Sequence, residues 1–461
     1  MTGARRALIT AALAMLTGCF EARERPTIPV YGDIVVLSDP SGADVTIDGV
    51  GTGATTPANL QGVPAGPHEV ELSLRLSPNE SFWWTGQTTV SEHVLDTLDA
   101  ALQGGCGLDC DFAVDRGRVI CRSTSYGDTC AGVFFSSPAL IFPDVLGGSY
   151  AGGGRLLVAG VLGADAGDLK GDTVSTLVYR DGWIGRQHVT VGEYDRAQVM
   201  ELGYWATAQV EGESLLGLSV QQSVIAADSG GAEDMLFLRF EIANVSADER
   251  YRQIYPAVPE GGYTFESLYL GFGLDADVGA AGDDLGTFDH ELGLPFIYDA
   301  DFSDPELGLY SSSPALVGTV VVERPAGASE RTLTLWRRED DWDDGTQHGF
   351  AWRLLAGRLA AGDPIPDHPH PDIGYQPDAA HDYRFIDAHG PLVLAPGDTV
   401  TLTVALLLAE PVPGSYTPGQ PVAPGDPLAA GRPILSVAGR LRDLAARAPE
   451  LWERFKDLSI D

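Results

Sequence analysis

Glycine and proline are spread along the whole chain, and this distribution constrains the fold more than any other feature. The sequence holds 56 glycines and 30 prolines among 461 residues. Both residue types interrupt helices, so a chain punctuated in this way forms many turns and few long helices. Short runs with strand-type alternation lie between the turns, at intervals typical of β-sandwiches. We therefore predict an all-β protein of two or three domains.

The charge of the chain excludes one class of partner. The 65 acidic residues outnumber the 29 basic ones, which gives a formal net charge of −36. Nucleic-acid binding depends on lysine and arginine neutralising phosphates, so we exclude nucleic acid as a partner. The same charge repels anionic membrane surfaces. Attachment to a membrane would therefore require a lipid.

The first 18 residues have the form of an export signal. Two arginines precede an apolar run from Ala7 to Leu16, which is roughly half of the ~20 residues that a transmembrane helix needs. The run ends in Leu16-Thr17-Gly18-Cys19, which resembles the lipobox of bacterial lipoproteins. The resemblance implies that residues 1–18 are removed and that Cys19 is acylated. The alternative is a soluble secreted protein with a cysteine at its cleavage site.

The residues after Cys19 indicate where the anchored chain resides. Phe20, rather than Asp, follows the anchor, and the sorting rule of the lipoprotein family then points to the outer membrane. Residues 19–31 contain charges and two prolines without an apolar period, so they are predicted to be an extended tether.

Residues 32–98 are predicted to form a small β-sandwich, because short alternating runs are separated by glycine turns. Four turns of this segment resemble those of the PEGA domain, and Ser41 stands where that family has Glu. These turns are Pro40-Ser41-Gly42-Ala43, Ile47-Asp48-Gly49, Gly53-Ala54-Thr55-Thr56-Pro57 and Pro64-Ala65-Gly66-Pro67-His68. The resemblance implies an accessory module of bacterial surface proteins without catalytic residues, in which His68 packs on its turn.

Residues 105–433 are predicted to form one large antiparallel β-sandwich or two packed ones. The strand-like runs are Leu156–Val161, Met235–Ile242, Leu268–Leu274, Leu316–Val322 and Thr399–Leu408. Three stretches, 235–244, 268–279 and 390–400, are similar to a loosely defined group of uncharacterised secreted bacterial β-proteins. That group implies fold and export and supplies no chemistry.

The last segment, 434–461, differs from the rest of the chain. Apolar residues recur at helical spacing from Ile434 to Leu458, and Pro449 is predicted to start a second short helix. We expect this segment to pack against the sandwich; a docking surface for a partner protein is the alternative.

Four cysteines remain after Cys19 is assigned to lipid, namely Cys106, Cys110, Cys121 and Cys130. Disulfides persist in exported chains, so two disulfides are predicted, and three pairings are open. A zinc site is the alternative, although its cysteines normally come in closer pairs.

An acidic stretch follows one of the predicted strands, and clustered carboxylates suit calcium, which takes six to eight oxygen ligands. The candidate ligands are Asp275, Asp277, Asp283, Asp284 and Asp289. The spacing does not match an EF-hand. A solvated acidic loop without a metal is the alternative.

Two further constellations are weaker. His368 and His370 alternate with prolines in an extended segment and would share a face, as in a transition-metal site, but no third ligand is evident and a polar loop is the alternative. Asp228-Ser229-Gly230-Gly231 resembles the nucleophile turn of trypsin-like proteases, but no Thr-Ala-x-His motif precedes it, and its position favours a hairpin.

Tryptophans supply candidate ligand-binding positions. Trp83 and Trp84 are adjacent and point to opposite faces of a strand, so one is expected in the core and the other is either a sugar-stacking platform or an interdomain contact. Trp342 lies among four aspartates, which would suit a glycosidase with two carboxyl groups ~5 to 9 Å apart, or simply a charged turn.

The sequence thus predicts a lipid-anchored, non-catalytic protein of the cell envelope with a structural or ligand-binding role. Polysaccharide and other envelope proteins are the expected partners, and calcium is the candidate cofactor. An exported hydrolase that uses carboxylates, such as a glycosidase, is the alternative.

Overall fold

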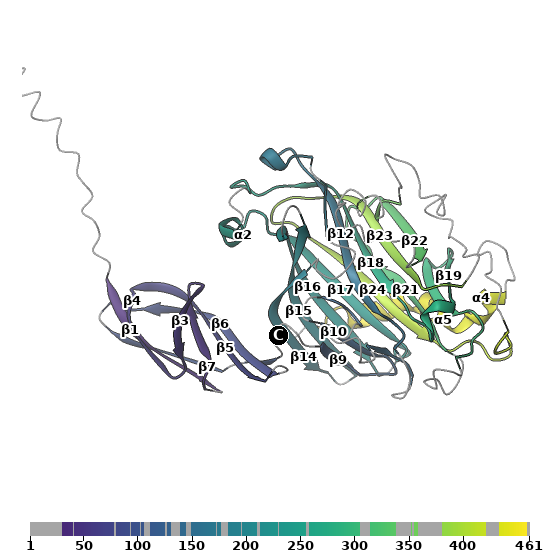
Figure 1. The fold of residues 1–461 in the computed structure, drawn as a ribbon, viewed down its shortest axis with the longest axis horizontal. Helices are drawn as coiled ribbons and strands as arrows, with labels where there is room; N and C mark the ends of the chain where they lie inside the picture. Colours follow the sequence, from purple (N-terminus) through teal and green to yellow (C-terminus); the bar gives the residue numbers. More distant parts are fainter. Residues whose placement is uncertain are drawn as a thin grey trace, which may run out of the picture. The chain divides into compact units, whose positions relative to one another are not determined.

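The chain divides into two compact units, and the boundary between them in the sequence lies between Gly104 and Gly105. Figure 1 shows their strands. This computed structural model describes residues 30–39, 41–77, 80–92, 94–101, 103–105, 111–124, 127–130, 139–143, 149–171, 173–176, 183–194, 196–209, 213–228, 230–254, 258–304, 314–337, 352, 355–357, 380–420 and 433–458. Cys19 and the other residues of the predicted signal and tether up to 29 lie outside these ranges.

The first unit is built from two sheets that enclose one small core. Their strand orders are β4-β1-β7 and β3-β2-β5-β6-β8. The strands are β1 (Tyr31–Asp39), β2 (Asp44–Ile47), β3 (Val50–Thr55), β4 (Ala58–Pro64), β5 (Gly66–Ser77), β6 (Glu80–Val90), β7 (Leu95–Ala101) and β8 (Gln103–Gly105). Alternate residues of the strands, such as Ile34 and Val36 of β1 and Val70 and Leu72 of β5, point into the core.

The turn between β2 and β3 explains why the chain has Asp-Gly there. Ile47 pairs with Val50, so the loop consists of Asp48 and Gly49 alone. Both have positive φ, 51° and 74°, as a type I′ turn demands. The predicted tight turn at this position is confirmed.

The second unit contains three sheets. A five-stranded sheet has the order β13-β12-β18-β23-β22, an eight-stranded sheet has the order β14-β15-β16-β17-β24-β21-β20-β19, and a small one has the order β11-β10-β9. The strands are β9 (Asp111–Val114), β10 (Ile120–Thr124), β11 (Leu140–Ile141), β12 (Gly153–Leu162), β13 (Thr173–Ser175), β14 (Trp183–Glu193), β15 (Ala197–Gln209), β16 (Glu213–Ala227), β17 (Met235–Asn244), β18 (Phe265–Asp275), β19 (Asp284–Asp289), β20 (Leu294–Asp299), β21 (Leu316–Glu323), β22 (Glu330–Arg337), β23 (Tyr383–Leu394) and β24 (Thr399–Ala409). The helices are η1 (Gly167–Leu169), α2 (Glu249–Ile254), η2 (Ala281–Asp283), α4 (Pro433–Val437) and α5 (Gly439–Phe455).

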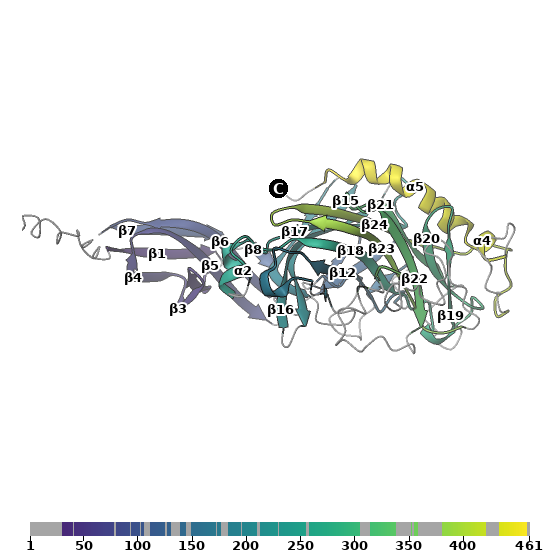
Figure 2. The same cartoon turned by 90° about the horizontal axis from the view of Figure 1, so that it is seen from above.

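Within the second unit, the eight-stranded sheet has an apolar layer on each face. On β17, Leu238 and Phe240 belong to the core shared with the five-stranded sheet, whereas Phe237 belongs to a second core. Helix α5 packs in that second core and contacts β21 and β24, and Figure 2 shows it lying along the sheet. A strand buried on both faces carries a continuous apolar run instead of an alternating one, as β24 does from Val404 to Ala409.

The sequence-based predictions of fold class are confirmed. All five predicted strand-like runs lie within strands, which pair mainly in antiparallel sheets, and β16 and β17 form the hairpin expected around residue 229. The prediction that Pro449 starts a second helix is wrong, because α5 continues through Pro449. Burial of Trp452 and Phe455 on the sheet outweighs the hydrogen bond that proline cannot donate. No helix among the described residues is long and apolar enough to cross a bilayer.

Candidate metal centre

A cluster of aspartates lies where the chain leaves the five-stranded sheet and enters the eight-stranded one. β18 ends at Asp275, the chain continues through η2, and β19 begins at Asp284 as the edge strand of the larger sheet. β19 pairs with β20 so that Asp284 lies directly opposite Asp299. Residues opposite each other in an antiparallel pair share a face, so two carboxylates meet at the open end of this hairpin.

Two groups of three aspartates have ligand atoms within 4.8 Å of one another. One group consists of Asp275, Asp277 and Asp382, and the other consists of Asp283, Asp299 and Asp304. The carboxyl of Asp284 interacts electrostatically with Asp277 of the first group and with Asp283 and Asp299 of the second. Carboxylate oxygens suit hard cations such as calcium or magnesium.

Asp284 and Asp299 are both fully buried. One oxygen of each is satisfied: Val278 N–H donates to Asp284 Oδ2 at 3.1 Å, and the N–H groups of Asp301 and Ser303 donate to Asp299 Oδ1. Among the described residues, no donor reaches Asp284 Oδ1 or Asp299 Oδ2. The carboxyl of Asp304 faces Asp299, and a hydrogen bond between the two would need a shared proton.

Burial and like charges disfavour the ionised forms of both residues. Burial is the first cause that raises the pKa of Asp284 well above its ordinary value, and neighbouring aspartates raise it further. Burial, followed by Asp304, raises the pKa of Asp299 to about 8. Without a counter-charge, this end of the hairpin therefore retains protons that exposed carboxylates would lose.

The first group already contains a counter-charge. Arg384 Nε donates to Asp275 Oδ1 at 2.7 Å, and Asp275 and Arg384 are register partners on β18 and β23. Burial, and next Arg155, lower the pKa of Arg384 to about 10, so it stays protonated at neutral pH. Gly152 fits closely here, since a Cβ on it would lie 2.9 Å from Asp275 Oδ2.

The structure rearranges the ligand set that the sequence predicts. Asp275, Asp277, Asp283 and Asp284 lie in or beside the cluster, but Asp289 lies at the opposite end of β19, where Arg442 pairs with it. Asp299, Asp304 and Asp382 join the cluster and were missed as candidate ligands. Asp299-x-Asp301-x-x-Asp304 follows the apolar run of β20 just as Asp275-x-Asp277 follows β18, and that signal would have identified the two missed residues of the second group.

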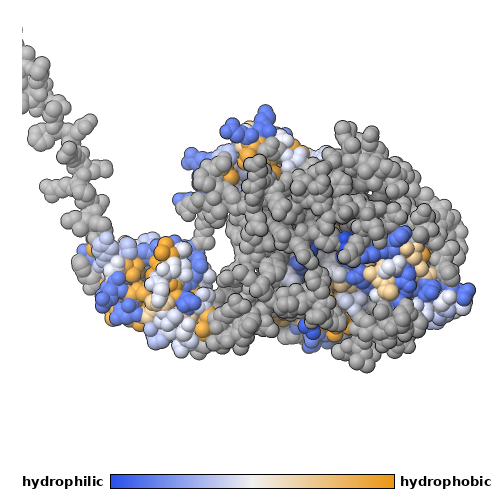
Figure 3. All heavy atoms as spheres, viewed as in Figure 1, coloured by the Kyte–Doolittle hydropathy of each residue, from blue (hydrophilic) through white to orange (hydrophobic). Residues whose placement is uncertain are grey.

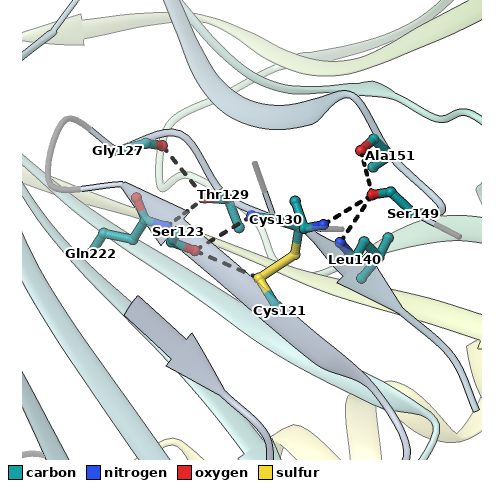
Figure 4. Close-up of a disulfide and its surroundings, with 10 residues drawn as sticks. Cys121, Ser123, Gly127, Thr129, Cys130, Leu140, Ser149, Ala151 and Gln222 are labelled. Atoms are coloured by element: carbon teal, nitrogen blue, oxygen red, sulfur yellow. Dashed lines mark hydrogen bonds between the residues drawn. A yellow bond between two sulfur atoms is a disulfide. The ribbon is translucent and has the colours of Figure 1, made fainter. Parts of the chain in front are cut away.

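One of the predicted disulfides is present. Cys121 of β10 is bonded to Cys130, with Cα atoms 4.6 Å apart. Figure 4 shows the pair beside Ser123 and Thr129, and Gln222 of β16 donates to Thr129 Oγ1 at 2.6 Å, which ties this loop to the eight-stranded sheet. A disulfide leaves no thiolate on these two residues for zinc, and Cys106 and Cys110 lie outside the described residues.

The remaining candidates fall in different places. His368, His370 and Trp342 lie outside the described residues, as does the side chain of Trp83. Trp84 is half-buried and packs against the core of the first unit.

His68 packs on its turn as expected. Its ring lies between Asp48 Oδ2 at 2.7 Å and the Pro64 carbonyl at 2.6 Å. The contact joins the β2–β3 turn to the end of β4.

Exposed apolar side chains gather where β1 begins. Val30 and Tyr31 are 38% and 45% exposed, and Val94 and Leu95 are 51% and 57% exposed. The Asp33 N–H donates to the Val94 carbonyl, and Asp33 pairs with Leu95, so Val94 and Leu95 lie beside Asp33, two residues after Tyr31. Figure 3 shows apolar residues among polar ones on the surface of this unit.

Comparison with known proteins identifies one segment. The PEGA domain family matches residues 31–75, so the first unit contains a PEGA domain. A search of curated proteins gives no match.

Among solved structures, a lysyl oxidase of Pichia pastoris is similar at 10% identity and a TM-score of 0.27, over 75% of this chain and 64% of that one. An amine oxidase of Aspergillus nidulans is similar at 10% identity and a TM-score of 0.28, over 91% of this chain and 72% of that one. TM-scores this low support no statement about fold or activity.

Proposed function

We propose that this chain is a lipid-anchored protein of the bacterial cell envelope with a non-catalytic, structural or ligand-binding role. In this proposal Cys19 carries the acyl chains, the PEGA domain follows the tether, and the second unit is displayed for binding. The observation that carries the proposal is that the PEGA match, at residues 31–75, directly follows a segment of lipoprotein-signal form. The disulfide supports it as well, because disulfides persist outside the cytosol.

The state of the clustered carboxylates favours a non-catalytic role over a glycosidase. A glycosidase presents two carboxyl groups on either side of an accessible sugar. Asp284 and Asp299 are instead fully buried, and the grouped ligand atoms lie within 4.8 Å of one another. These two carboxyl groups are therefore closed to a sugar ring in the described part of the chain.

The exposed apolar side chains around Val30 and Leu95 support a position near the membrane. Val30 and Tyr31 are the first described residues, at the end of the segment that we propose as the tether. Several acyl chains together hold a protein stably at a bilayer, and apolar contacts at its surface would add to that binding. Polysaccharide and envelope proteins remain the proposed partners.

Mass spectrometry of the mature N-terminus tests the anchor. We expect Cys19 to be the first residue and to carry acyl chains, and the chain to fractionate with the outer membrane. Cys19→Ser should release the chain from the membrane fraction while its circular dichroism stays unchanged. An unmodified thiol, or a mature chain that starts elsewhere, would refute the anchor.

A glycan array probed with acyl-free protein tests the binding role. Retention of a polysaccharide class would support it, and silence across the array would restrict the proposal to a structural role.

A further inference from the structure

Two buried aspartates of the second unit, Asp387 and Asp289, are neutralised by an arginine. Arg331 donates from Nε to Asp387 Oδ1 at 2.8 Å and from Nη2 to Asp387 Oδ2 at 2.6 Å, and Asp387 is fully buried. Arg442 donates from Nε to Asp289 Oδ2. A buried carboxylate without such a partner is strongly destabilising, so these pairs show how the fold stabilises charge in its interior.

Asp284 and Asp299 differ from Asp387 and Asp289. Both are fully buried, they lie opposite each other on β19 and β20, and neither has a basic partner among the described residues. One oxygen of each, Asp284 Oδ1 and Asp299 Oδ2, lacks a donor in the described part of the chain. Like charges directly opposite each other destabilise a strand pair. A bound cation would supply a compensating charge.

The chemistry of the surroundings selects the class of cation. The ligand atoms of Asp283, Asp299 and Asp304 lie within 4.8 Å of one another, close enough for all three to bind one ion. All three ligands are carboxylates, and the group contains no histidine or cysteine. Zinc and copper favour nitrogen or sulfur ligands, whereas calcium takes six to eight oxygens in flexible geometry.

We propose that one calcium ion binds to Asp283, Asp299 and Asp304, beside Asp284, in the second unit. The other group is not assigned an ion, because Arg384 already neutralises Asp275. The Gly279 backbone lies so close to Asp304 that a Cβ there would overlap Asp304 Oδ2, so this carboxylate is confined to the site.

The ion would link three segments that are separate in the sequence. Asp283 ends η2 in the connection from β18, Asp299 ends β20, and Asp304 belongs to the loop that follows. The site therefore joins the connection from β18 to β19, which links the two large sheets, to the β19–β20 hairpin at the edge of the eight-stranded sheet. Calcium would act as a structural ligand that the folded unit binds and the unfolded chain does not. This inference does not depend on the lipid anchor or on any carbohydrate ligand.

The experiment measures thermal unfolding of the mature full-length chain, in chelator and in millimolar calcium, for three proteins. These are the wild type, the double variant Asp284→Asn/Asp299→Asn, and the control Asp289→Asn, which alters a buried aspartate at the other end of β19. Both amides of the double variant retain an oxygen that can accept the existing backbone hydrogen bonds. Bound calcium per wild-type chain is measured separately by equilibrium dialysis.

We expect calcium to raise the Tm of the wild type by about 5 °C, as for a ligand at roughly 100 times its Kd. The control should show the same rise from its own baseline. The double variant should show no rise. In chelator it should unfold at the same temperature as the wild type or higher, because neutral amides replace carboxyl groups whose ionised form is disfavoured by burial. Dialysis should find one calcium ion per wild-type chain.

Three results would overturn the proposal. The first is a wild-type chain that binds no calcium in dialysis, and this result does not depend on any variant folding. The second is an equal calcium response in the wild type and the double variant, which would place the ion elsewhere. The third is an equal rise with magnesium at the same concentration, which would refute the choice of calcium.

Discussion

Individual charged residues in this protein are governed by what faces them. Asp387 is fully buried, and burial by itself would raise its pKa. Arg331 and His389 outweigh that effect and hold the pKa of Asp387 at about 2. Asp299 is buried to the same degree by exposed area, but it faces another carboxyl, and its pKa is raised to about 8. Identical side chains thus differ in charge because one faces a guanidinium and the other an acid.

His68 makes the PEGA domain sensitive to pH. Burial lowers its pKa, but the Asp48 carboxylate and the Pro64 carbonyl, both acceptors, outweigh burial and raise it above 6.5. A group with a raised folded-state pKa contributes stability that is fully present below the unfolded pKa and is lost as the pH rises through the folded pKa. We expect the Tm of this domain to fall as the pH rises from about 6.5 through the raised pKa of His68.

Circular dichroism melts across this pH range check the prediction. His68→Gln should lower the Tm at acidic pH and flatten its dependence on pH, whereas Glu92→Gln, a change on the exposed surface of the same domain, should leave the slope intact. A wild-type Tm that is constant or rises over this range would contradict the role given to His68.

Local sequence patterns identified some of the candidate metal ligands and missed others for a geometric reason. Asp275 and Asp277 could be found because they follow an apolar run directly. Asp289 was included because it is close in sequence, yet a strand advances ~3.3 Å per residue and so places it roughly 16 Å from Asp284. Asp382 reaches Asp275 through the pairing of β18 with β23, a long-range register that no local pattern records.

At the scale of elements, strand positions could be predicted because alternation and turn residues are local properties. The pairing order could not be predicted, since β17 pairs with β24 although residues 245–398 lie between them in the sequence. The helix boundary could not be predicted either. Proline is common at the first position of a helix, so Pro449 indicated a helix start, but α5 continues through it because tertiary packing holds Trp452 and Phe455 on the sheet.

Trp452 is predicted to be the main attachment of α5 to the eight-stranded sheet. It is 3% exposed, and its ring lies 5.4 Å from that of Phe237. Removing a buried aromatic side chain leaves a cavity, so Trp452→Ala should lower the free energy of unfolding of the second unit by about 3 kcal/mol. Chemical denaturation monitored by fluorescence of the remaining tryptophans measures this change.

The neighbouring residue provides a control for that experiment. Glu453 is exposed on the same helix, so Glu453→Ala should change the stability by less than about 0.5 kcal/mol. If both variants unfold alike, α5 does not contribute to the core as the structure indicates.

At the scale of the whole molecule, the first unit has its own core, and among the described residues this core shares no buried residue with the cores of the second unit. We therefore expect a fragment of residues 30–105 to fold by itself. It should show dispersed amide resonances, unfold cooperatively and reproduce the pH dependence that His68 gives.

The fragment of residues 30–105 is also a negative control for the calcium experiment. The aspartates of the proposed site all lie in the second unit, so the Tm of the fragment should not respond to calcium. A fragment that is unfolded at neutral pH would show that its core requires the rest of the chain.

The pairing of β17 with β24 has a consequence for biosynthesis. β17 is a central strand of the eight-stranded sheet, and one of its two neighbours is β24, the last strand of the described residues. A nascent polypeptide therefore carries an open, strongly apolar strand edge until β24 has been synthesised. Folding with such high contact order is slow and exposes the intermediate to aggregation. A chaperone that covers this edge would prevent such aggregation, and so would delivery of the polypeptide in unfolded form.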